Sequence, residues 1–206
     1  MTLTALGISA SPRANGNSDL LVREALRGCE EAGAQTEFLR LGDYRIGACT
    51  ECNTCQKTGV CVLQDDYQGI LDRLLEVDRL VFATPVFFMA VSAQAKLFID
   101  RGQALWARKH LLHLPLFQPR RDRRAMVVAV GGSRSTRQFD GIRRTMQSYF
   151  ECVEIAYVST LFVNQVDAAG AVRRHATALP EAFRLGAALA DAASPAQRAT
   201  QVELFG

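Results

Sequence analysis

The chain has 206 residues, of which 49% are hydrophobic and 22% charged, and its formal net charge is +3. These values are typical of a globular protein and predict a single domain over residues 1–206. The charge is too small to indicate nucleic-acid binding, no apolar run reaches the length of a membrane span, and the first residues lack the pattern of a signal peptide. We therefore expect a cytoplasmic protein that binds neither nucleic acid nor membrane.

Short apolar runs alternate with amphipathic segments along the chain. Strands are predicted at residues 3–8, 36–41, 80–83, 126–130 and 155–163. Helices are predicted at residues 18–32, 67–77, 93–106, 141–150 and 177–193, followed by a peripheral tail over 194–206. Apolar strands without polar alternation are buried on both faces, so the pattern predicts an open parallel α/β sheet. Ligands of such sheets bind beyond the carboxyl ends of the strands.

A polar loop follows the first strand and reads Gly-Ile-Ser-Ala-Ser-Pro-Arg-Ala-Asn-Gly-Asn-Ser over residues 7–18. Its hydroxyls, its backbone N–H groups and the following helix N-terminus can form an anion site. The side chains expected to donate are Ser9, Ser11, Arg13, Asn17 and Ser18. A turn with an N-cap would use the same residue types, but their density favours a phosphate. No dinucleotide or NTPase fingerprint is present.

Four cysteines lie in the loop over residues 43–64, which follows the second strand. They are Cys49, Cys52, Cys55 and Cys61, in the spacing C-x-x-C-x-x-C-x5-C. This density suits a cubane iron–sulfur cluster, whose four irons each need one sulfur ligand. Zinc usually draws its ligands from two separated pairs, and disulfides fit such tight spacings badly. The spacing favours the cluster and leaves zinc and unliganded or redox-active thiols as alternatives.

Two further loops follow the third and fourth predicted strands. Pro85 removes a backbone donor and should end the third strand. The aromatic pair Phe87 and Phe88 then either flanks a planar heterocycle or packs in the core. A small-residue turn, Gly131-Gly132-Ser133, follows the fourth strand at the same edge of the sheet.

The remaining charged motifs predict no catalytic side chain. His110 and His113 lack the spacing of a zinc protease helix and are expected at the surface. The arginine runs at residues 120–124 and 173–175 are expected to form a solvated surface rather than to meet a phosphate ligand or an acidic partner. Asp100 and Arg101, at the end of a helical pattern, are expected to fix the loop that follows them.

Together these motifs resemble the flavodoxin-like NAD(P)H-dependent FMN reductase superfamily and, within it, the iron–sulfur flavoproteins. The resemblance covers about residues 3–165. It is carried by residues 7–13 and 16–18, the cysteine motif, Asp65-Asp66, and residues 84–88 and 96–101. It implies a flavodoxin-like five-stranded parallel sheet in the order 2-1-3-4-5, with helices on both faces.

The resemblance also implies two cofactors. The phosphate of FMN would lie on Ser9, Ser11, Arg13, Asn17 and Ser18, and its isoalloxazine against Pro85, Val86, Phe87, Phe88, Gly131, Gly132 and Ser133. A [4Fe–4S] cluster would be held by Cys49, Cys52, Cys55 and Cys61. The oligomer would be a homodimer or homotetramer in which the cluster and the flavin of different subunits approach each other.

We therefore expect a redox flavoprotein that relays electrons from NAD(P)H or a reduced carrier to a small molecule or a protein. Placing two cofactors and tuning their potentials requires no acid/base side chain. One alternative is an NAD(P)H-dependent FMN or quinone reductase whose cysteines hold no cluster. The other is a non-catalytic, zinc-stabilised interaction module on the same scaffold.

Overall fold

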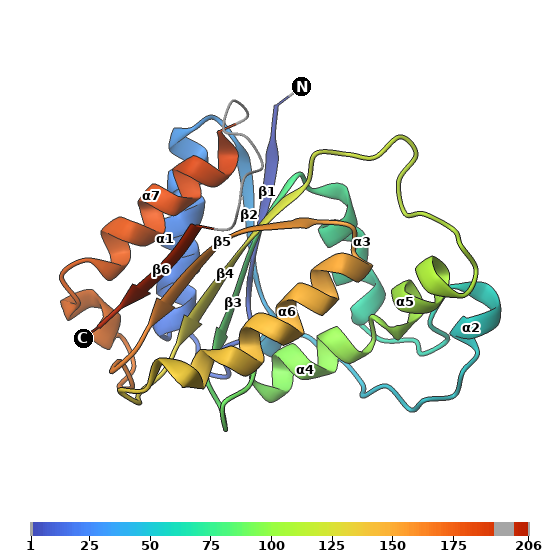
Figure 1. The fold of residues 1–206 in the computed structure, drawn as a ribbon, viewed down its shortest axis with the longest axis horizontal. Coiled ribbons are helices and arrows are strands. Elements are labelled where there is room, and N and C mark those ends of the chain that lie inside the picture. Colours follow the sequence, from blue (N-terminus) through green and yellow to red (C-terminus); the bar gives the residue numbers. More distant parts are fainter. Residues whose placement is uncertain (1, 192–199, 206) are drawn as a thin grey trace.

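The protein is built on one parallel sheet, seen near its centre in Figure 1; the computed structural model describes residues 2–191 and 200–205. The strands lie in the order β2 (Gln35–Arg40), β1 (Thr4–Ser9), β3 (Arg79–Pro85), β4 (Arg124–Val130), β5 (Ala156–Val163) and β6 (Thr200–Leu204). Every neighbouring pair is parallel. The predicted flavodoxin-like order 2-1-3-4-5 is confirmed, and a sixth strand extends the sheet beyond β5.

The sixth strand lies within the segment predicted as a peripheral tail. Its register against β5 runs from Ser159 opposite Thr200 to Val163 opposite Leu204. Val202 and Leu204 pack on the core, whereas Gln201 and Glu203 are exposed. This short alternation suits an edge strand and differs from the continuous apolar runs that revealed the other strands. Residues 192–193 of the last predicted helix, and residues 194–199 and 206 of the predicted tail, lie outside the described residues.

Helices cover both faces of the sheet (Figure 1). One face packs against α1 (Asn17–Glu31) and α7 (Ala178–Ala190), the other against α3 (Tyr67–Glu76), α4 (Ala93–Asp100) and α6 (Asp140–Cys152). Beside the sheet lie α2 (Cys55–Thr58) and α5 (Gln103–His110). Short 3-10 turns form at Leu41–Asp43, Thr136–Phe139 and Ala171–Arg174. Within the described ranges, no helix is long and apolar enough to cross a lipid bilayer.

The helix predicted over residues 93–106 is two helices, because the chain turns at Arg101 and Gly102. A Cβ at Gly102 would lie 2.8 Å from the Ile99 carbonyl oxygen and 3.0 Å from the ring of Tyr149. The glycine therefore permits a tight junction against α6. The expectation that Arg101 fixes the loop after the helix is wrong: its side chain is buried and contacts the cysteine loop.

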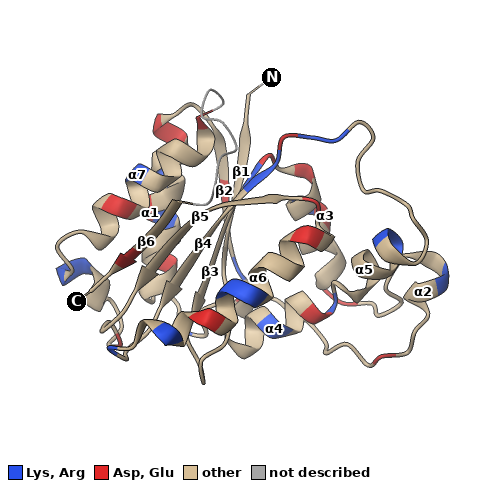
Figure 2. Cartoon of the chain, in the orientation of Figure 1, with Lys and Arg blue, Asp and Glu red and all other residues tan. Residues whose placement is uncertain are grey.

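The arginine run before β4, blue in Figure 2, is only partly a solvated surface. Arg123 is 2% exposed and donates to the carbonyl oxygens of Leu74, Val77 and Val153. Burial lowers the pKa of Arg123 to about 10. Arg124 is buried as well and donates to both carboxylate oxygens of Asp122. The prediction of a solvated surface is therefore wrong for these two residues, which join helix ends to the sheet.

Candidate functional site

One cavity opens at the carboxyl ends of β1, β3, β4 and β5. It is lined by Ser11, Pro12, Arg13, Gly16, Asn17, Ser18, Pro85, Val86, Phe87, Val130, Gly131, Gly132, Val166, Asp167 and Ala169. Nine of the predicted flavin-binding residues are among them: Ser11, Arg13, Asn17, Ser18, Pro85, Val86, Phe87, Gly131 and Gly132. Ser9, Phe88 and Ser133 do not line this cavity. The cavity therefore lies where ligands of open parallel sheets bind.

Ser9 supports the first loop from beneath. Its buried hydroxyl donates to Asp19 and accepts from the backbone N–H of Ser11. The other carboxylate oxygen of Asp19 accepts from the Asn15 N–H at 2.7 Å. This network shapes the loop, while Gly16 precedes α1 without a side-chain hydrogen bond to the first turn. The first N–H groups of a 15-residue helix thus face the cavity region, as an anion site requires.

Two predicted phosphate residues also fasten the loop that follows β5. Asn17 donates to the Ala168 carbonyl at 3.0 Å and accepts from the Val172 N–H at 3.2 Å. Arg13 donates to the Asp167 carbonyl at 3.1 Å. The β5 loop supplies Val166, Asp167 and Ala169 to the cavity, and the sequence analysis missed it. The available signal was its position after a buried strand, which the other three loops share.

The chain after β3 forms a tight exposed turn. As predicted, the strand ends at Pro85, and Phe87 and Ala90 then exchange backbone hydrogen bonds of 3.0 Å in both directions. Phe88 and Met89 have φ of 48° and 63°, a left-handed conformation that bulky residues rarely adopt. Phe88 is fully exposed and Phe87 is 46% exposed. The alternative in which Phe87 and Phe88 pack in the core is therefore wrong. Of the two, only Phe87 lines the cavity.

The turn after β4 needs small residues because a buried glutamine lies against it. A Cβ on Gly131 would lie 2.1 Å from Oε1 of Gln138, and one on Gly132 would lie 3.2 Å from Asp167 Cβ. Gln138 donates to the Ser133 carbonyl at 2.9 Å. Larger residues at these two positions would collide with Gln138 and Asp167, so the glycine backbone itself forms this part of the cavity wall.

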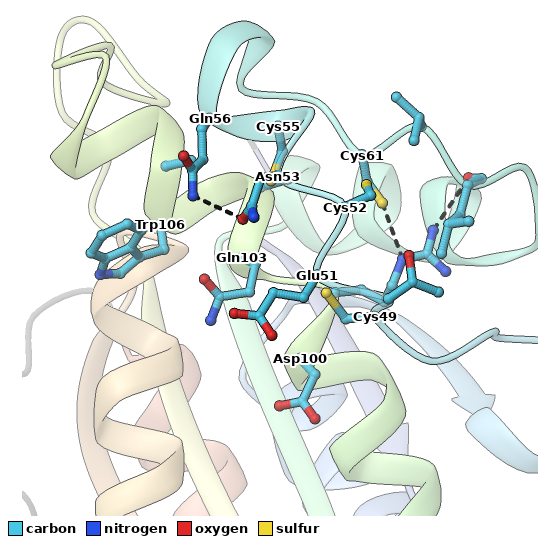
Figure 3. A pocket seen from close by; sticks show the side chains of 16 residues that line it. Cys49, Glu51, Cys52, Asn53, Cys55, Gln56, Cys61, Asp100, Gln103 and Trp106 are labelled. Atoms are coloured by element: carbon cyan, nitrogen blue, oxygen red, sulfur yellow. Dashed lines mark hydrogen bonds between the residues drawn. The ribbon is translucent and has the colours of Figure 1, made fainter.

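A second cavity is lined by all four predicted cluster ligands (Figure 3). Cys49, Cys52, Cys55 and Cys61 come from the loop and α2, whereas Asp100, Gln103 and Trp106 come from α4 and α5. The two cavities share no lining residue.

The thiols of this cavity are free and electrostatically close to one another. All six cysteines of the chain are unpaired. The pKa of the Cys55 thiol is raised by burial and then by the neighbouring thiols of Cys61, Cys52 and Cys49. The pKa of Cys52 is lowered by hydrogen bonds from the backbone and hydroxyl of Thr54. Four neighbouring thiolates would repel one another, so a cationic centre bound by all four would stabilise them.

The four cysteines supply the type of donor that an iron–sulfur cluster uses, one thiol for each of four irons. They line one cavity. Among the described residues, however, no group of three or more His, Cys, Asp or Glu side chains is placed so that it could hold a metal ion. The chemistry of the donor set therefore fits a cluster, while the thiols are not gathered around a metal in this structure.

The ends of the cysteine loop are held by two adjacent aspartates. Asp66 accepts from the Arg45 N–H at 2.7 Å, and Asp65 accepts from the Gly47 and Tyr67 N–H groups at 2.8 and 3.0 Å. Partial burial of Asp65 opposes its ionisation, but the hydrogen bonds from Arg101 and these amides outweigh it and lower its pKa. The Asp65-Asp66 pair thus closes the base of the loop.

Comparison with known proteins identifies a family and relatives that match the larger part of the chain. A family model described as NADPH-dependent FMN reductase matches residues 3–165. An iron–sulfur flavoprotein of Archaeoglobus fulgidus is 33% identical over 144 residues, which are 70% of each chain. Iron–sulfur flavoprotein MJ1083 of Methanocaldococcus jannaschii is 40% identical over 133 residues, which are 65% of this chain and 64% of that protein. A second A. fulgidus iron–sulfur flavoprotein is matched over 45% of its length.

Solved structures show the same fold. A flavone reductase superposes with a TM-score of 0.71 at 23% identity, covering 98% of this chain and 66% of that one. An NAD(P)H:quinone oxidoreductase from Methanothermobacter marburgensis gives a TM-score of 0.69 at 20% identity, covering 93% and 98%. At these identities the likeness supports the fold alone.

Proposed function

Because the chain belongs to the NADPH-dependent FMN reductase family and, within it, to the iron–sulfur flavoproteins, we propose that it is an oxidoreductase using FMN and a [4Fe–4S] cluster. It would relay electrons from NAD(P)H or a reduced carrier to a small-molecule or protein acceptor. The observation that carries this proposal is the presence of two separate cavities, one built from the flavin-binding loops and one lined by four free thiols.

The first cavity supports FMN binding by the arrangement of its walls. Ser11, Asn17 and Ser18, with the N-terminus of α1, would bind the phosphate, and Arg13 would add a charge-assisted hydrogen bond. Pro85 to Phe87 and the Gly131-Gly132 turn would hold the flat ring between them. Ser9 would act indirectly, by holding the loop in shape through Asp19.

The second cavity supports cluster binding by Cys49, Cys52, Cys55 and Cys61. When bound, FMN accepts electrons in pairs and the cluster carries them singly, so the two together convert between these modes. The chain contributes the hydrogen bonds, charges and burial that place each group. We propose in addition an assembly of two or four copies, in which one subunit's cluster would meet another's flavin.

A second candidate is an FMN reductase without a cluster. The putative NAD(P)H-dependent FMN-containing oxidoreductase YwqN of Bacillus subtilis is 34% identical over 129 residues, which are 61% of this chain and 65% of that protein. Because of this relative, an FMN reductase without a cluster is the main alternative function for this chain.

Anaerobic purification and reconstitution with iron, sulfide and FMN separates these functions. We expect one FMN with about four irons and four acid-labile sulfides per chain, the stoichiometry of a cubane. FMN without sulfide would favour the cluster-free reductase, and zinc without FMN would favour the interaction module. Cys152→Ser is the matched control, because Cys152 lies in α6 and outside the cysteine cavity.

A further inference from the structure

Arg101 is a charged side chain that the fold buries beside the cysteine cavity. It lies between α4 and α5 and is 1% exposed. A buried guanidinium without partners would be strongly unfavourable, so its contacts indicate why it is there.

All of its hydrogen-bond acceptors lie in the cysteine loop or directly after it. Nε donates to Cys61 Sγ at 3.3 Å, and NH2 donates to the Leu63 carbonyl at 3.2 Å. NH1 donates to Asp65 Oδ2 at 2.6 Å and to the Gly47 carbonyl at 3.1 Å. One rigid guanidinium therefore joins both ends of the cysteine loop to one of its sulfurs.

The contacts close into a network. Oδ2 of Asp65 accepts from both Arg101 and the Gly47 N–H, and Oδ1 accepts from the first residue of α3, Tyr67. The guanidinium carbon of Arg101 lies 4.6 Å from the centroid of the Tyr67 ring. Both the position and the orientation of the guanidinium are thus fixed by the protein alone.

We propose that Arg101 is a positioning residue of the cysteine centre. It orders the cysteine loop before any cluster binds, and it presents Cys61 with a permanent hydrogen bond to its sulfur. The second part rests on the proposed function, because it concerns a bound cluster. A donor and a positive charge beside a ligand sulfur stabilise the more negative, reduced state, so Arg101 raises the reduction potential.

Two substitutions separate the charge from the geometry. Arg101→Lys keeps the charge but loses the fork that reaches four acceptors, and Arg101→Met removes both. Asp65→Asn is a milder variant that weakens the ion pair between Asp65 and Arg101 but keeps Arg101 itself. Arg123→Lys is the matched control, because Arg123 is also buried but donates its hydrogen bonds to backbone carbonyls away from the cysteine loop.

The first measurement uses the full chain without iron and follows amide hydrogen exchange over residues 47–63. In Arg101→Lys and Asp65→Asn we expect exchange about tenfold faster than in the wild type, the effect of losing one charge-assisted hydrogen bond. In Arg123→Lys the rates over this segment should stay at the wild-type values.

The second measurement uses the reconstituted protein and records its midpoint potential and reduced-state EPR spectrum. We expect the potential to fall from wild type to Arg101→Lys and further in Arg101→Met, with Arg123→Lys unchanged. If Arg101→Met does not fold, Arg101→Lys and Asp65→Asn carry the comparison.

The outcomes distinguish the two proposals. Wild-type exchange rates in Arg101→Lys and Asp65→Asn, or an unchanged potential in Arg101→Lys, would overturn the role of Arg101. A wild-type protein that takes up no sulfide would instead refute the proposed function, and the exchange rates would still decide whether Arg101 orders the loop.

Discussion

Two polar residues at or beneath the first cavity hold its loops in place. Asn17 lines the cavity, yet both ends of its amide already bind the β5 loop. Ser9 is buried and acts through its hydrogen bonds with Asp19 and the Ser11 N–H. Arg13 differs from both, because one backbone carbonyl holds it and much of its guanidinium stays free to meet an anion. At the scale of single residues, Arg13 is therefore the most direct test of the phosphate site.

Arg13→Ala should weaken FMN binding about tenfold, because one charge-assisted hydrogen bond to the phosphate is lost. Fluorescence titration of the flavin-free protein measures the dissociation constant. Arg27→Ala is the control, since Arg27 lies on the exposed side of α1 and pairs with Glu24. Equal affinity in wild type and Arg13→Ala would mean that the phosphate lies elsewhere.

Among the elements, the crossing of α1 and α7 depends on two glycines. A Cβ on Gly186 would lie 1.9 Å from the Ala25 carbonyl oxygen, and one on Gly28 would lie 2.1 Å from the Phe183 carbonyl oxygen. Cys29 is buried at this crossing, and its thiol donates to the Gly186 carbonyl at 3.2 Å. Burial raises the pKa of Cys29 to about 12, so this thiol stays neutral and packs as an apolar group.

Gly186→Ala should lower the free energy of unfolding by roughly 1–3 kcal/mol, because the helices must separate to admit the methyl group. Gly69→Ala is the matched control: nothing lies within 4 Å of its Cβ, and in a helix interior alanine should be neutral or stabilising by up to about 1 kcal/mol. Urea unfolding measures both. A similar loss in the two variants would argue against the close crossing.

The turn over residues 87–90 is the element where sequence and local conformation disagree most. Two positive φ values in succession are typical of Asn-Gly, but here the central residues are Phe88 and Met89. The fold thus holds two bulky, exposed side chains in a left-handed backbone conformation directly after Phe87.

Replacing the pair by Phe88→Asn and Met89→Gly together should stabilise the protein by about 1 kcal/mol, since the strain is relieved and little buried surface is lost. Thermal unfolding of the flavin-free protein checks this. A melting temperature below that of the wild type would show that Phe88 and Met89 make packing contacts that stabilise the fold.

For the molecule as a whole, sequence reasoning predicted the order of the sheet, because most of its strands are short apolar runs. The structure also brings the four clustered cysteines to one cavity and three of the loops that follow strands to another. Sequence reasoning failed where a side chain reaches across the fold. Arg101 and Arg123 look like surface charges in the sequence, and only the tertiary arrangement supplies their buried acceptors. β6 was missed because its alternation is that of a half-exposed edge strand.

An aspartate at the amino ends of the strands, opposite the first cavity, should make the stability of the fold depend on pH. Hydrogen bonds from Arg124 hold the pKa of Asp122 below its ordinary range. A carboxyl with a lowered pKa stabilises the fold at neutral pH, and this contribution is lost as pH falls through the folded-state pKa.

Asp122→Asn should therefore cost about 1 kcal/mol at pH 7, a modest effect because the carboxylate is half exposed. The difference from wild type should begin to shrink near the ordinary aspartate pKa of about 3.9 and disappear only below the lowered folded-state pKa. Melting temperatures recorded from pH 7 to pH 3 test this. A difference that does not shrink at all between pH 5 and pH 3 would mean that the loss comes from packing rather than charge.

Low-temperature EPR of the anaerobically reconstituted, reduced protein tests the central claim most directly. The wild type and Cys152→Ser should show the signal of a reduced cluster with FMN bound, whereas Cys52→Ser should lose the signal and keep FMN. An unchanged signal in Cys52→Ser, or a silent wild type without sulfide, would contradict the assignment of the four thiols to a cluster.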